Sequence, residues 1–376
     1  MLRYIAKAFH TWQKTRRTHS PIITVEINKR RLLDNVQALR EIAPQWQIAP
    51  VLKSNAYGHD LVTVAGIVEE TSPAFICVDS YPEAETIRHA GIKTPILIMG
   101  FTPMSTIRAG RLSKTAFTIT SLEQLREIAD TSSTIHLKFD TGMHRRGIEP
   151  SALQDVLNII TEASCVVEGV MSHFAESEKA SDVTKRQISE WNALVAQCKT
   201  LLPNMKYYHL ANSGGFAYHN KIDANVGRTG LAMYGINPGN LKCELQPVLE
   251  MKSIVTEVRT LHAGESVGYS GTYTATQDMK TAVIPVGYFE GLDRRLSNKG
   301  VYTVGSTTLP IIGRISMNMS CCDASAVPKL TYGDAITIIS ADSTQANSVV
   351  KMAEICETIP YELLVRIPAG LRRVVV

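Results

Sequence analysis

The sequence contains no apolar run approaching the roughly 20 residues that a membrane-spanning helix needs. It has no internal repeat and no low-complexity tract, which excludes solenoid and fibrous architectures. The seven cysteines are odd in number and include no Cys-x-x-Cys pair, so they argue against a disulfide framework or a zinc site and predict a reducing, cytoplasmic compartment. The net charge of +4 is too small to indicate nucleic acid or an anionic membrane as a partner, whereas small anionic ligands remain compatible.

What the chain does contain indicates a large, ordered protein. It has 376 residues, of which 44% are hydrophobic and 20% are charged. This length exceeds that of one ordinary domain, so it predicts two domains or one barrel with an appendage.

Residues 1–20 form a separate feature. Leu2, Ile5, Phe9 and Trp12 recur at helical spacing, with basic residues between them. This pattern is typical of a basic amphipathic helix and lacks the uninterrupted apolar stretch of a secretory signal. We expect an N-terminal extension that packs on the body of the protein, and contact with an anionic membrane surface is the less favoured alternative.

From residue 48 to about 236, short β-branched runs alternate with amphipathic helical stretches, which indicates βα units and a parallel sheet. We expect eight strands, at residues 48–53, 74–78, 95–100, 116–119, 135–140, 165–173, 207–211 and 231–236. Helices are expected between them, for example at 61–70, 81–90, 121–130, 151–163 and 184–202. Eight such units favour an α/β fold in the form of a (β/α)8 TIM-like barrel over an open doubly wound sheet.

Polar side chains gather where these strands end. The candidates are Lys53, Lys138, Asp140, His173, His209, Ser213 and Arg228. Active sites of (β/α)8 barrels lie at the carboxyl ends of the strands, so this alignment predicts a site on that face. Any single histidine among ten would ordinarily be a core or surface residue, and the convergence of several polar residues is what argues for function.

The pattern changes after residues 237–247, whose Asn, Pro and Gly content is typical of a linker. Stretches rich in Val, Ile and Thr, such as 301–312, predict a mainly antiparallel β domain over residues 246–376, with one helix at about 344–357. The barrel then occupies residues 21–240. A strand at 23–27 is a candidate to join the β domain instead.

Lys53 ends the apolar run 47–52 and is followed at once by small, turn-forming residues. Desolvation at the end of a strand lowers the pKa of a lysine amine and frees it as a nucleophile or base, so this position predicts a Schiff-base lysine. The alternative is a strand-end lysine whose amine reaches water.

Nine stretches in chain order carry a recognisable pattern. They are VLKSNAYGH at 51–59, KFDTGMHRRG at 138–147, SHF at 172–174, HLANS at 209–213, GRTGLAMYG at 227–235, VGYSGTYTA at 267–275, PVGY at 285–288, GRISMN at 313–318 and PYE at 360–362. Together they resemble the alanine racemase family of pyridoxal-phosphate-dependent enzymes of fold type III. The resemblance implies a homodimer with shared active sites that interconverts L- and D-alanine by two-base transfer of the α-proton and supplies D-alanine for peptidoglycan.

The resemblance implies a site for pyridoxal phosphate (PLP). Lys53 would hold the cofactor aldehyde as a Schiff base and then move the proton on one face of the α-carbon. The phosphate group would be bound by Tyr57, Ser213, the backbone amides near Gly230 and Leu231, and Tyr361 from the second domain. Arg228 would face the pyridine nitrogen. Because an arginine does not readily give up a proton, the ring would be a poorer electron sink, and fast reprotonation would compete with transamination.

The resemblance assigns Tyr269 as the base on the opposite face, reached from the partner subunit. A free tyrosine has a pKa near about 10 and needs assistance to work near neutrality. His173, Arg228 and His209 resemble the hydrogen-bonded chain that supplies this assistance.

The substrate side is assigned in the same way. Arg145 would bind the substrate carboxylate through its bidentate donors. Lys138 matches a lysine that is carbamylated in many family members to neutralise and orient that arginine, and Asp140 is the alternative partner. Tyr288 and Met317 would line the substrate pocket.

The sequence departs from the family pattern at Asn318, where many members have aspartate, and at Phe289 and Glu290, which replace a more common Ala-Asp pair. We place Asn318 in the substrate pocket, so serine or a broader set of amino acids remains an alternative substrate. Two other classes stay open. One is a non-catalytic PLP-binding protein, and the other is a metal-dependent barrel enzyme that uses the side chains of Asp140, His173 and His209.

Overall fold

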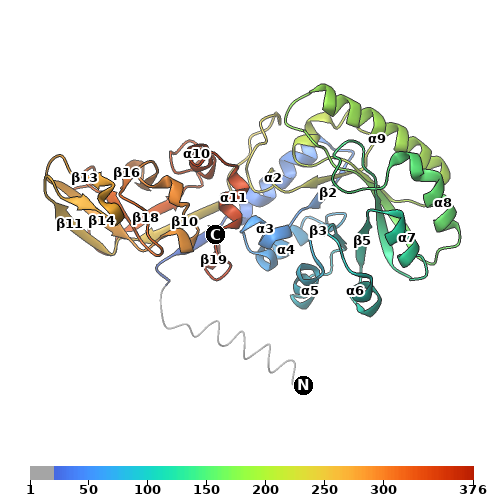
Figure 1. Ribbon diagram of the computed structural model, residues 1–376, viewed down its shortest axis with the longest axis horizontal. Helices are drawn as coiled ribbons and strands as arrows, with labels where there is room; N and C mark the ends of the chain where they lie inside the picture. The colour runs from blue at the N-terminus through green and yellow to red at the C-terminus, as the bar shows by residue number, and fades with distance from the viewer. Residues whose placement is uncertain (1–20) are drawn as a thin grey trace, which may run out of the picture.

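The computed structural model describes residues 21–376, so the amphipathic helix predicted for residues 1–20 lies outside the described residues. Figure 1 shows two parts side by side, a barrel and an elongated β domain. No helix in the described part of the chain is long and apolar enough to span a membrane.

Eight short parallel strands form the barrel and confirm the predicted fold class. They are β2 (Gln47–Pro50), β3 (Ile76–Val78), β4 (Ile96–Ile98), β5 (Thr115–Ile119), β6 (Thr134–Lys138), β7 (Val166–Met171), β8 (Tyr207–His209) and β9 (Val226–Thr229). β3 to β8 pair in order as one parallel sheet, and β2 pairs with β9. The Leu52 amide donates to the Cys77 carbonyl at 2.8 Å and the Asn225 amide donates to the Tyr208 carbonyl at 3.1 Å, so the two sheets join into a closed barrel.

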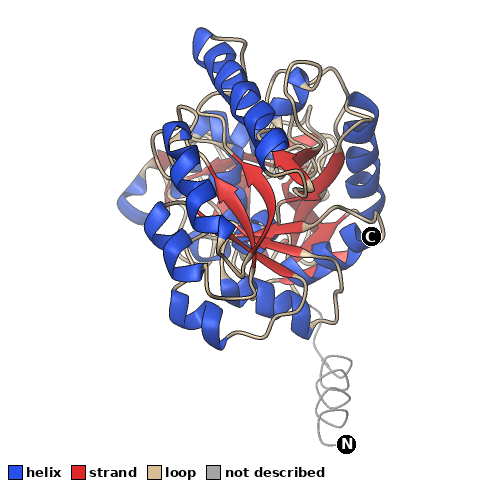
Figure 2. Ribbon diagram, turned by 90° about the vertical axis from the view of Figure 1, so that its right-hand side faces the viewer, coloured by secondary structure: helices blue, strands red, loops and turns tan. Residues whose placement is uncertain are grey.

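Helices cover the outside of these strands, as Figure 2 shows. They are α2 (Lys29–Ile42), α4 (Leu61–Glu69), α5 (Tyr81–His89), α6 (Met104–Ala109), α7 (Leu122–Ile128), α8 (Leu153–Thr161) and α9 (Asp182–Leu201). Strands covered on both faces need apolar residues on both, and all five residues of β5 are buried. The Ser121 and Ser181 hydroxyls cap the first turns of α7 and α9.

The strand predicted at 231–236 is wrong. The eighth strand is β9, and residues 231–235 form a turn in which the Tyr234 amide donates to the Leu231 carbonyl at 3.1 Å. Gly235 ends this turn with φ +88°, a conformation that favours glycine. Both segments are buried, and a short apolar run has the same pattern in a strand and in a buried turn, so periodicity selected the wrong one.

The second part contains a nine-stranded sheet in the order β11-β14-β17-β16-β15-β18-β10-β1-β19. Its strands are β1 (Thr24–Ile27), β10 (Leu249–Ile254), β11 (Glu257–Leu261), β14 (Met279–Ile284), β15 (Val301–Val304), β16 (Thr307–Ile312), β17 (Ser320–Asp323), β18 (Ala335–Ile339) and β19 (Arg372–Val375). All pairs are antiparallel except β1 with β19. A separate hairpin joins β12 (Ser266–Val267) to β13 (Tyr273–Thr274).

Two helices belong to this part. The helix expected at 344–357 is shorter, α10 (Val349–Ile355), because Asp342 accepts from the Thr344 amide at 2.9 Å and turns the chain before it. The helix α11 (Pro360–Val365) and the barrel helix α2 were not predicted.

The two parts meet where α11 packs against the short helical turn α3 (Lys53–Tyr57) that follows β2. Gly58 ends this turn with φ +82°, and a Cβ placed on it would lie 2.1 Å from the Leu364 carbonyl oxygen. The Gly58 carbonyl accepts from Arg373 at 2.8 Å. This contact therefore fixes the β domain against the end of the first barrel strand.

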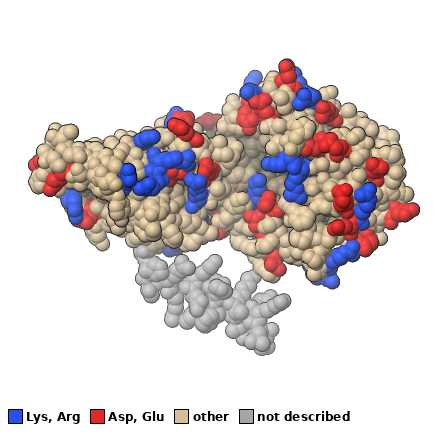
Figure 3. All heavy atoms as spheres, in the orientation of Figure 1, with Lys and Arg blue, Asp and Glu red and all other residues tan. Residues whose placement is uncertain are grey.

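Lys and Arg side chains are interspersed with Asp and Glu over the face drawn in Figure 3. The whole chain carries 39 basic and 35 acidic residues. Because the charges nearly balance, selectivity for an anionic ligand has to come from groups inside a site rather than from the surface as a whole.

We expect Gly58→Ala to destabilise the protein strongly, because it combines left-handed strain of about 1–2 kcal/mol with an overlap against backbone that cannot move freely. Gly91→Ala is the matched control, since Gly91 has φ +89° but no atom within 4 Å of the added Cβ. Denaturant unfolding measures both. Equal losses of stability would show that strain alone acts at Gly58 and that the contact with α11 adds nothing.

Candidate functional site

Lys53 opens a turn of unusual handedness. The four residues after it have φ between +52° and +56°; they are Ser54, Asn55, Ala56 and Tyr57. A left-handed conformation costs an L-residue about 1–2 kcal/mol, so four in succession persist only where the surroundings enforce them. Strain of this kind is characteristic of functional sites.

Four contacts enforce the turn. The Asn55 side chain accepts from the Leu61 amide at 2.9 Å, and the Ser54 amide donates to Glu83 at 2.7 Å. The Tyr57 ring packs against the rings of Tyr234 and Tyr361, with centroids 5.3 Å and 6.3 Å away. Lys53 is thereby fixed at the carboxyl end of the barrel.

Backbone and hydroxyl donors converge near this lysine. The amides of Gly230 and Ala232 donate to the Ser213 hydroxyl oxygen at 3.3 Å and 3.2 Å. Between them, the Leu231 amide has no hydrogen-bond acceptor among residues 21–376. A Cβ at Gly230 would lie 2.8 Å from the Tyr57 hydroxyl oxygen, so glycine permits this close approach. Such a set of donors is suited to an anion such as phosphate.

The hydroxyls of Tyr57 and Tyr361 are two further donors suited to an anion. Burial raises the pKa of both phenols, so they remain protonated donors at neutral pH. Both line a cavity of about 280 Å³ together with Lys53, Ser213 and Arg228. We call this the barrel cavity. Its volume lies near the lower end of the range for small-molecule sites, about 300–1,000 Å³.

Arg228 forms the inner wall of the barrel cavity and is only 3% exposed. Its guanidinium donates to the carbonyls of Ser172, His209 and Leu210 at 2.6–3.0 Å and faces Nδ1 of His209 at 2.7 Å and Nδ1 of His173 at 3.2 Å. Among the described residues no carboxylate pairs with it. Burial lowers its pKa to about 10, so it remains a cation at neutral pH.

The two histidines beside Arg228 are neutral. Burial, followed by the charge of Arg228, lowers the pKa of His173 to about 3 and that of His209 well below its ordinary value. Each presents a ring nitrogen as an acceptor to the guanidinium. His209 also contacts His136 through its other ring nitrogen, at 2.8 Å.

Lys138, the last residue of β6, lies close by. Burial and then the charges of Arg145 and Arg228 lower the pKa of its amine to about 8. Asp140 was an alternative partner for the Arg145 guanidinium, but its carboxylate accepts from four backbone amides, those of residues 142–145. Asp140 therefore shapes the loop that carries Arg145.

These contacts also count against the metal-binding alternative. Both ring nitrogens of His209 are engaged, and the Asp140 carboxylate is occupied by backbone donors. Within residues 21–376 no three His, Cys, Asp or Glu side chains are grouped as metal ligands.

The remaining candidates lie elsewhere. Tyr269, Tyr288 and Met317 line a second cavity of about 530 Å³ in the β domain, and we call them the β-domain cluster. Tyr269 is 68% exposed and Met317 54%. Figure 1 shows β13, just after Tyr269, at the end of the molecule far from the barrel. One chain therefore brings together Lys53, the anion donors, Arg228 and Tyr361, but not the β-domain cluster.

Asn318 belongs to the same loop as Met317. The Asn318 side-chain amide donates to one carboxylate oxygen of Glu290 at 2.8 Å. The other carboxylate oxygen of Glu290 accepts from the Gly287 backbone amide at 2.8 Å. The Phe289 amide donates to the Met317 carbonyl at 2.9 Å, which ties the two loops together. Glu290 was noted only as a departure from the family pattern, and its pairing with the other departure, Asn318, was not foreseen.

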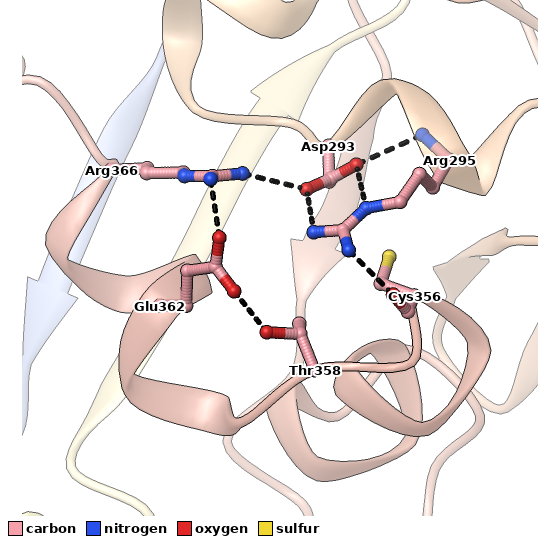
Figure 4. A network of polar contacts seen from close by, with 6 residues as sticks. All are labelled: Asp293, Arg295, Cys356, Thr358, Glu362 and Arg366. Carbon is pink, nitrogen blue, oxygen red and sulfur yellow. Dashed lines mark hydrogen bonds and ion pairs between the residues drawn. The ribbon is translucent and has the colours of Figure 1, made fainter.

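A network missed by sequence reasoning holds α11, the helix that carries Tyr361. Figure 4 shows Asp293 between two arginines, Arg295 from its own loop at 2.7 Å and Arg366 from the end of α11 at 3.0 Å. Arg366 also pairs with Glu362, which accepts from Thr358. The Asp293 side chain is only 6% exposed, so this network anchors α11 to the β domain.

Comparisons with family descriptions and with individual proteins identify the same family. Two family descriptions match, "Alanine racemase, N-terminal domain" over residues 27–238 and "Alanine racemase, C-terminal domain" over residues 248–375. The alanine racemase of Syntrophobacter fumaroxidans is 32% identical over 352 residues, which are 90% of this chain and 93% of that one.

Solved structures agree. The alanine racemase from Bacillus anthracis with bound L-Ala-P is 28% identical with a TM-score of 0.87, covering 95% of this chain and 96% of its own. The alanine racemase from Bartonella henselae with covalently bound pyridoxal phosphate has a TM-score of 0.84 at 24% identity, covering 95% of this chain and 100% of its own, and this likeness shows the fold alone.

Asp293→Asn tests the anchor of α11. Hydrogen bonding to Arg295 is the main cause that holds the Asp293 pKa below its ordinary value. The pKa of Asp293 is lower in the folded protein than in the unfolded chain. The ionised carboxylate therefore stabilises the fold above about pH 4, and this stabilisation is lost as the pH falls through the folded-state pKa. We expect the variant to lose about 1–3 kcal/mol near neutral pH. In thermal unfolding, its difference from the unaltered protein should shrink below about pH 4.

Asp130→Asn is the control, because the exposed Asp130–Arg108 pair, with Asp130 at 68% exposure, should contribute little. A loss at Asp293→Asn that stays constant across the pH range would mean that shape, not charge, is responsible.

Proposed function

The chain belongs to the alanine racemase family, and on that premise we propose that it is a PLP-dependent racemase that interconverts L- and D-alanine. The observation that carries the proposal is the barrel cavity. One lysine, a set of hydrogen-bond donors suited to an anion, and a buried arginine line this cavity, whose volume is about 280 Å³.

The donor set of the barrel cavity fits pyridoxal phosphate. Ser213, the amides of Gly230 and Leu231, and the hydroxyls of Tyr57 and Tyr361 would bind its phosphate, and Lys53 would hold its aldehyde. When bound, the cofactor would supply an electron-withdrawing ring that makes the α-proton of the amino acid acidic. Lys53 then removes or returns that proton on one face of the α-carbon.

Arg228 would lie against the pyridine nitrogen, with His173 and His209 behind it as neutral acceptors. A guanidinium cation does not transfer a proton to the ring, so the ring withdraws electrons only weakly. Reprotonation at the α-carbon is then favoured over the slower release of a keto acid.

The second base would be Tyr269 of the partner subunit. Within one chain the β-domain cluster lies away from Lys53. Its three large side chains are exposed, and so are those of two residues close to it in the sequence, Phe289 and Met319. Exposed apolar groups of this size at one place indicate an interface. A homodimer in which each barrel cavity is covered by the other subunit's β-domain cluster would provide both bases.

The substrate carboxylate would be bound by Arg145, with the Met317 backbone and Tyr288 from the partner subunit. Lys138 would orient Arg145. Its lowered pKa of about 8 leaves part of the amine neutral near pH 8, which is the form that reacts with carbon dioxide to give a carbamate. Tyr361 narrows the barrel cavity and favours a small side chain such as that of alanine.

Serine or a broader set of amino acids is the second candidate, favoured by the pairing of Asn318 with Glu290 beside Met317. Supply of D-alanine for peptidoglycan and a cytoplasmic location accompany the alanine proposal. All seven cysteines are unpaired thiols, which supports a reducing compartment.

Proton NMR in heavy water tests the activity. The PLP-loaded protein should remove the α-proton signal of L-alanine, and chiral chromatography should detect D-alanine. Lys53→Ala should abolish both, and L-serine assayed separately decides between the two substrates. Bound chromophore without exchange on either amino acid would refute the racemase proposal and favour a non-catalytic PLP-binding protein.

Subunit mixing tests the shared site. Lys53→Ala and Tyr269→Phe chains should each be inactive alone. After they are unfolded, mixed and refolded together, about half of the dimers combine both chains and have one intact site, so activity should return to roughly a quarter of the wild-type value. No recovery, while each variant refolds as a dimer, would contradict a site built from two subunits.

A further inference from the structure

The barrel contains another cavity, of about 780 Å³, at the mouth opposite Lys53. It is lined by residues at the amino ends of the barrel strands, among them Ile96, Thr115 and Thr134. Its inner wall includes His136 and Glu168, two residues for which the proposed chemistry has no use.

These two residues connect the opposite mouth to Arg228 through a continuous series of polar contacts. Glu168 lies 3.8 Å from Nε2 of His136, and Nδ1 of His136 lies 2.8 Å from Nε2 of His209. Nδ1 of His209 lies 2.7 Å from the Arg228 guanidinium. The series runs through the barrel interior, where both histidines are at most 1% exposed.

Arg228 dictates the tautomer of each histidine. A guanidinium nitrogen can only donate, so Nδ1 of His209 must accept and its Nε2 must carry the hydrogen. Nδ1 of His136 must then accept from His209, which leaves the hydrogen of His136 on Nε2. That nitrogen lies 3.8 Å from the Glu168 carboxylate, a charge contact longer than a hydrogen bond, and Glu168 is the only one of the four groups with a negative charge.

The charges along this series complement one another. Arg228 is a buried cation, and no carboxylate among the described residues pairs with it directly. Glu168 is the carboxylate that this series of polar contacts reaches, and Glu168 also pairs with the exposed Lys206 at 3.1 Å. The neighbouring His136 and then Lys206 lower the pKa of Glu168, so it is ionised near neutral pH. The adjoining cavity reaches the protein surface, where an ionised carboxylate costs little.

We propose that Glu168 and His136 are positioning residues, which act through His209 to orient Arg228 and to offset its charge at the cofactor ring. This inference rests on the proposed function. The His136–His209 and His209–Arg228 hydrogen bonds polarise each other in a low-dielectric interior. The charge of the Glu168 carboxylate, 3.8 Å from the His136 ring, makes His136 a stronger acceptor for His209. His209 in turn becomes a stronger acceptor for Arg228, which holds the guanidinium toward the pyridine nitrogen.

The test compares Glu168→Gln with Asp130→Asn in the PLP-loaded protein. Glu168→Gln keeps the size and an acceptor but removes the charge. Asp130 is a carboxylate of the same cavity that does not contact His136, so it is the matched control. We expect Glu168→Gln to lower kcat by about tenfold with little change in KM and to shift the visible absorption band of the bound cofactor. Asp130→Asn should change neither.

A second variant, His136→Phe, interrupts the series but leaves the Glu168 charge. Its ring would remain among Phe75 and Tyr207, which already pack against His136. It should shift the cofactor band in the same direction as Glu168→Gln. Identical spectra and kcat in the wild type, Glu168→Gln and His136→Phe would overturn the proposal.

A third readout does not depend on turnover. NMR of isotopically labelled histidine ring nitrogens should show His136 and His209 as neutral Nε2–H tautomers, and Glu168→Gln should shift the His209 Nδ1 signal. A protein with these tautomers and shifts but no racemisation would refute the proposed function and leave the series of polar contacts intact. The opposite tautomer on either ring would overturn the series itself.

Discussion

The burial of the Arg228 guanidinium among neutral acceptors is the interaction on which much of this structure depends. Its donors meet the carbonyls of Ser172, His209 and Leu210, which lie at or beyond the carboxyl ends of two neighbouring strands, β7 and β8. Arg228 itself belongs to β9, which pairs with β2, the strand that leads to Lys53. One cation therefore ties together the strands that close the barrel and forms the wall of its cavity.

This arrangement is costly, because a buried cation without a carboxylate partner loses its hydration. The cost is offset by five acceptors, and its chemical consequence is a positive group where a cofactor ring nitrogen would lie. An acidic residue there would hold a proton on that nitrogen. Arg228 would instead favour a ring that withdraws electrons weakly, which would suit rapid return of the α-proton.

A second constraint is the division of the site. Lys53 is fixed by a left-handed turn that the barrel enforces from within and that α11 covers from the β domain. Tyr269 is held on a different surface of the same chain. In the proposed mechanism the first base is positioned within one chain, whereas the second would come from another chain. Assembly would then be part of the active site.

Sequence reasoning recovered the features that depend on local pattern. The barrel, the strand-end position of Lys53 and the alignment of polar residues with strand ends follow from periodicity, and strand-end polar residues are a strong signal in this fold. The eighth strand was misplaced, since Val226–Thr229 and the turn after it are equally buried. Helix α11 was missed, because it is short and much of its anchoring comes from Asp293, distant in sequence.

The residues missed at the site share one property: their roles arise from long-range contacts. The role of Glu290 is evident only from its contact with Asn318, and that of His136 only from its contact with His209, 73 positions away. In the sequence His136 is one polar residue within an apolar strand, which is ordinarily a satisfied core histidine. Only the structure shows that its neighbours are a carboxylate at one end and the Arg228 series at the other.

We infer that Arg228 would hold the cofactor ring nitrogen without a proton. The most direct test of this inference is NMR of the protein loaded with pyridoxal phosphate labelled at the ring nitrogen, recorded between about pH 6 and pH 9, the range in which side chains such as histidine and cysteine normally titrate. We expect the chemical shift of an unprotonated nitrogen throughout this range. A protonated nitrogen anywhere near neutral pH would contradict the inference.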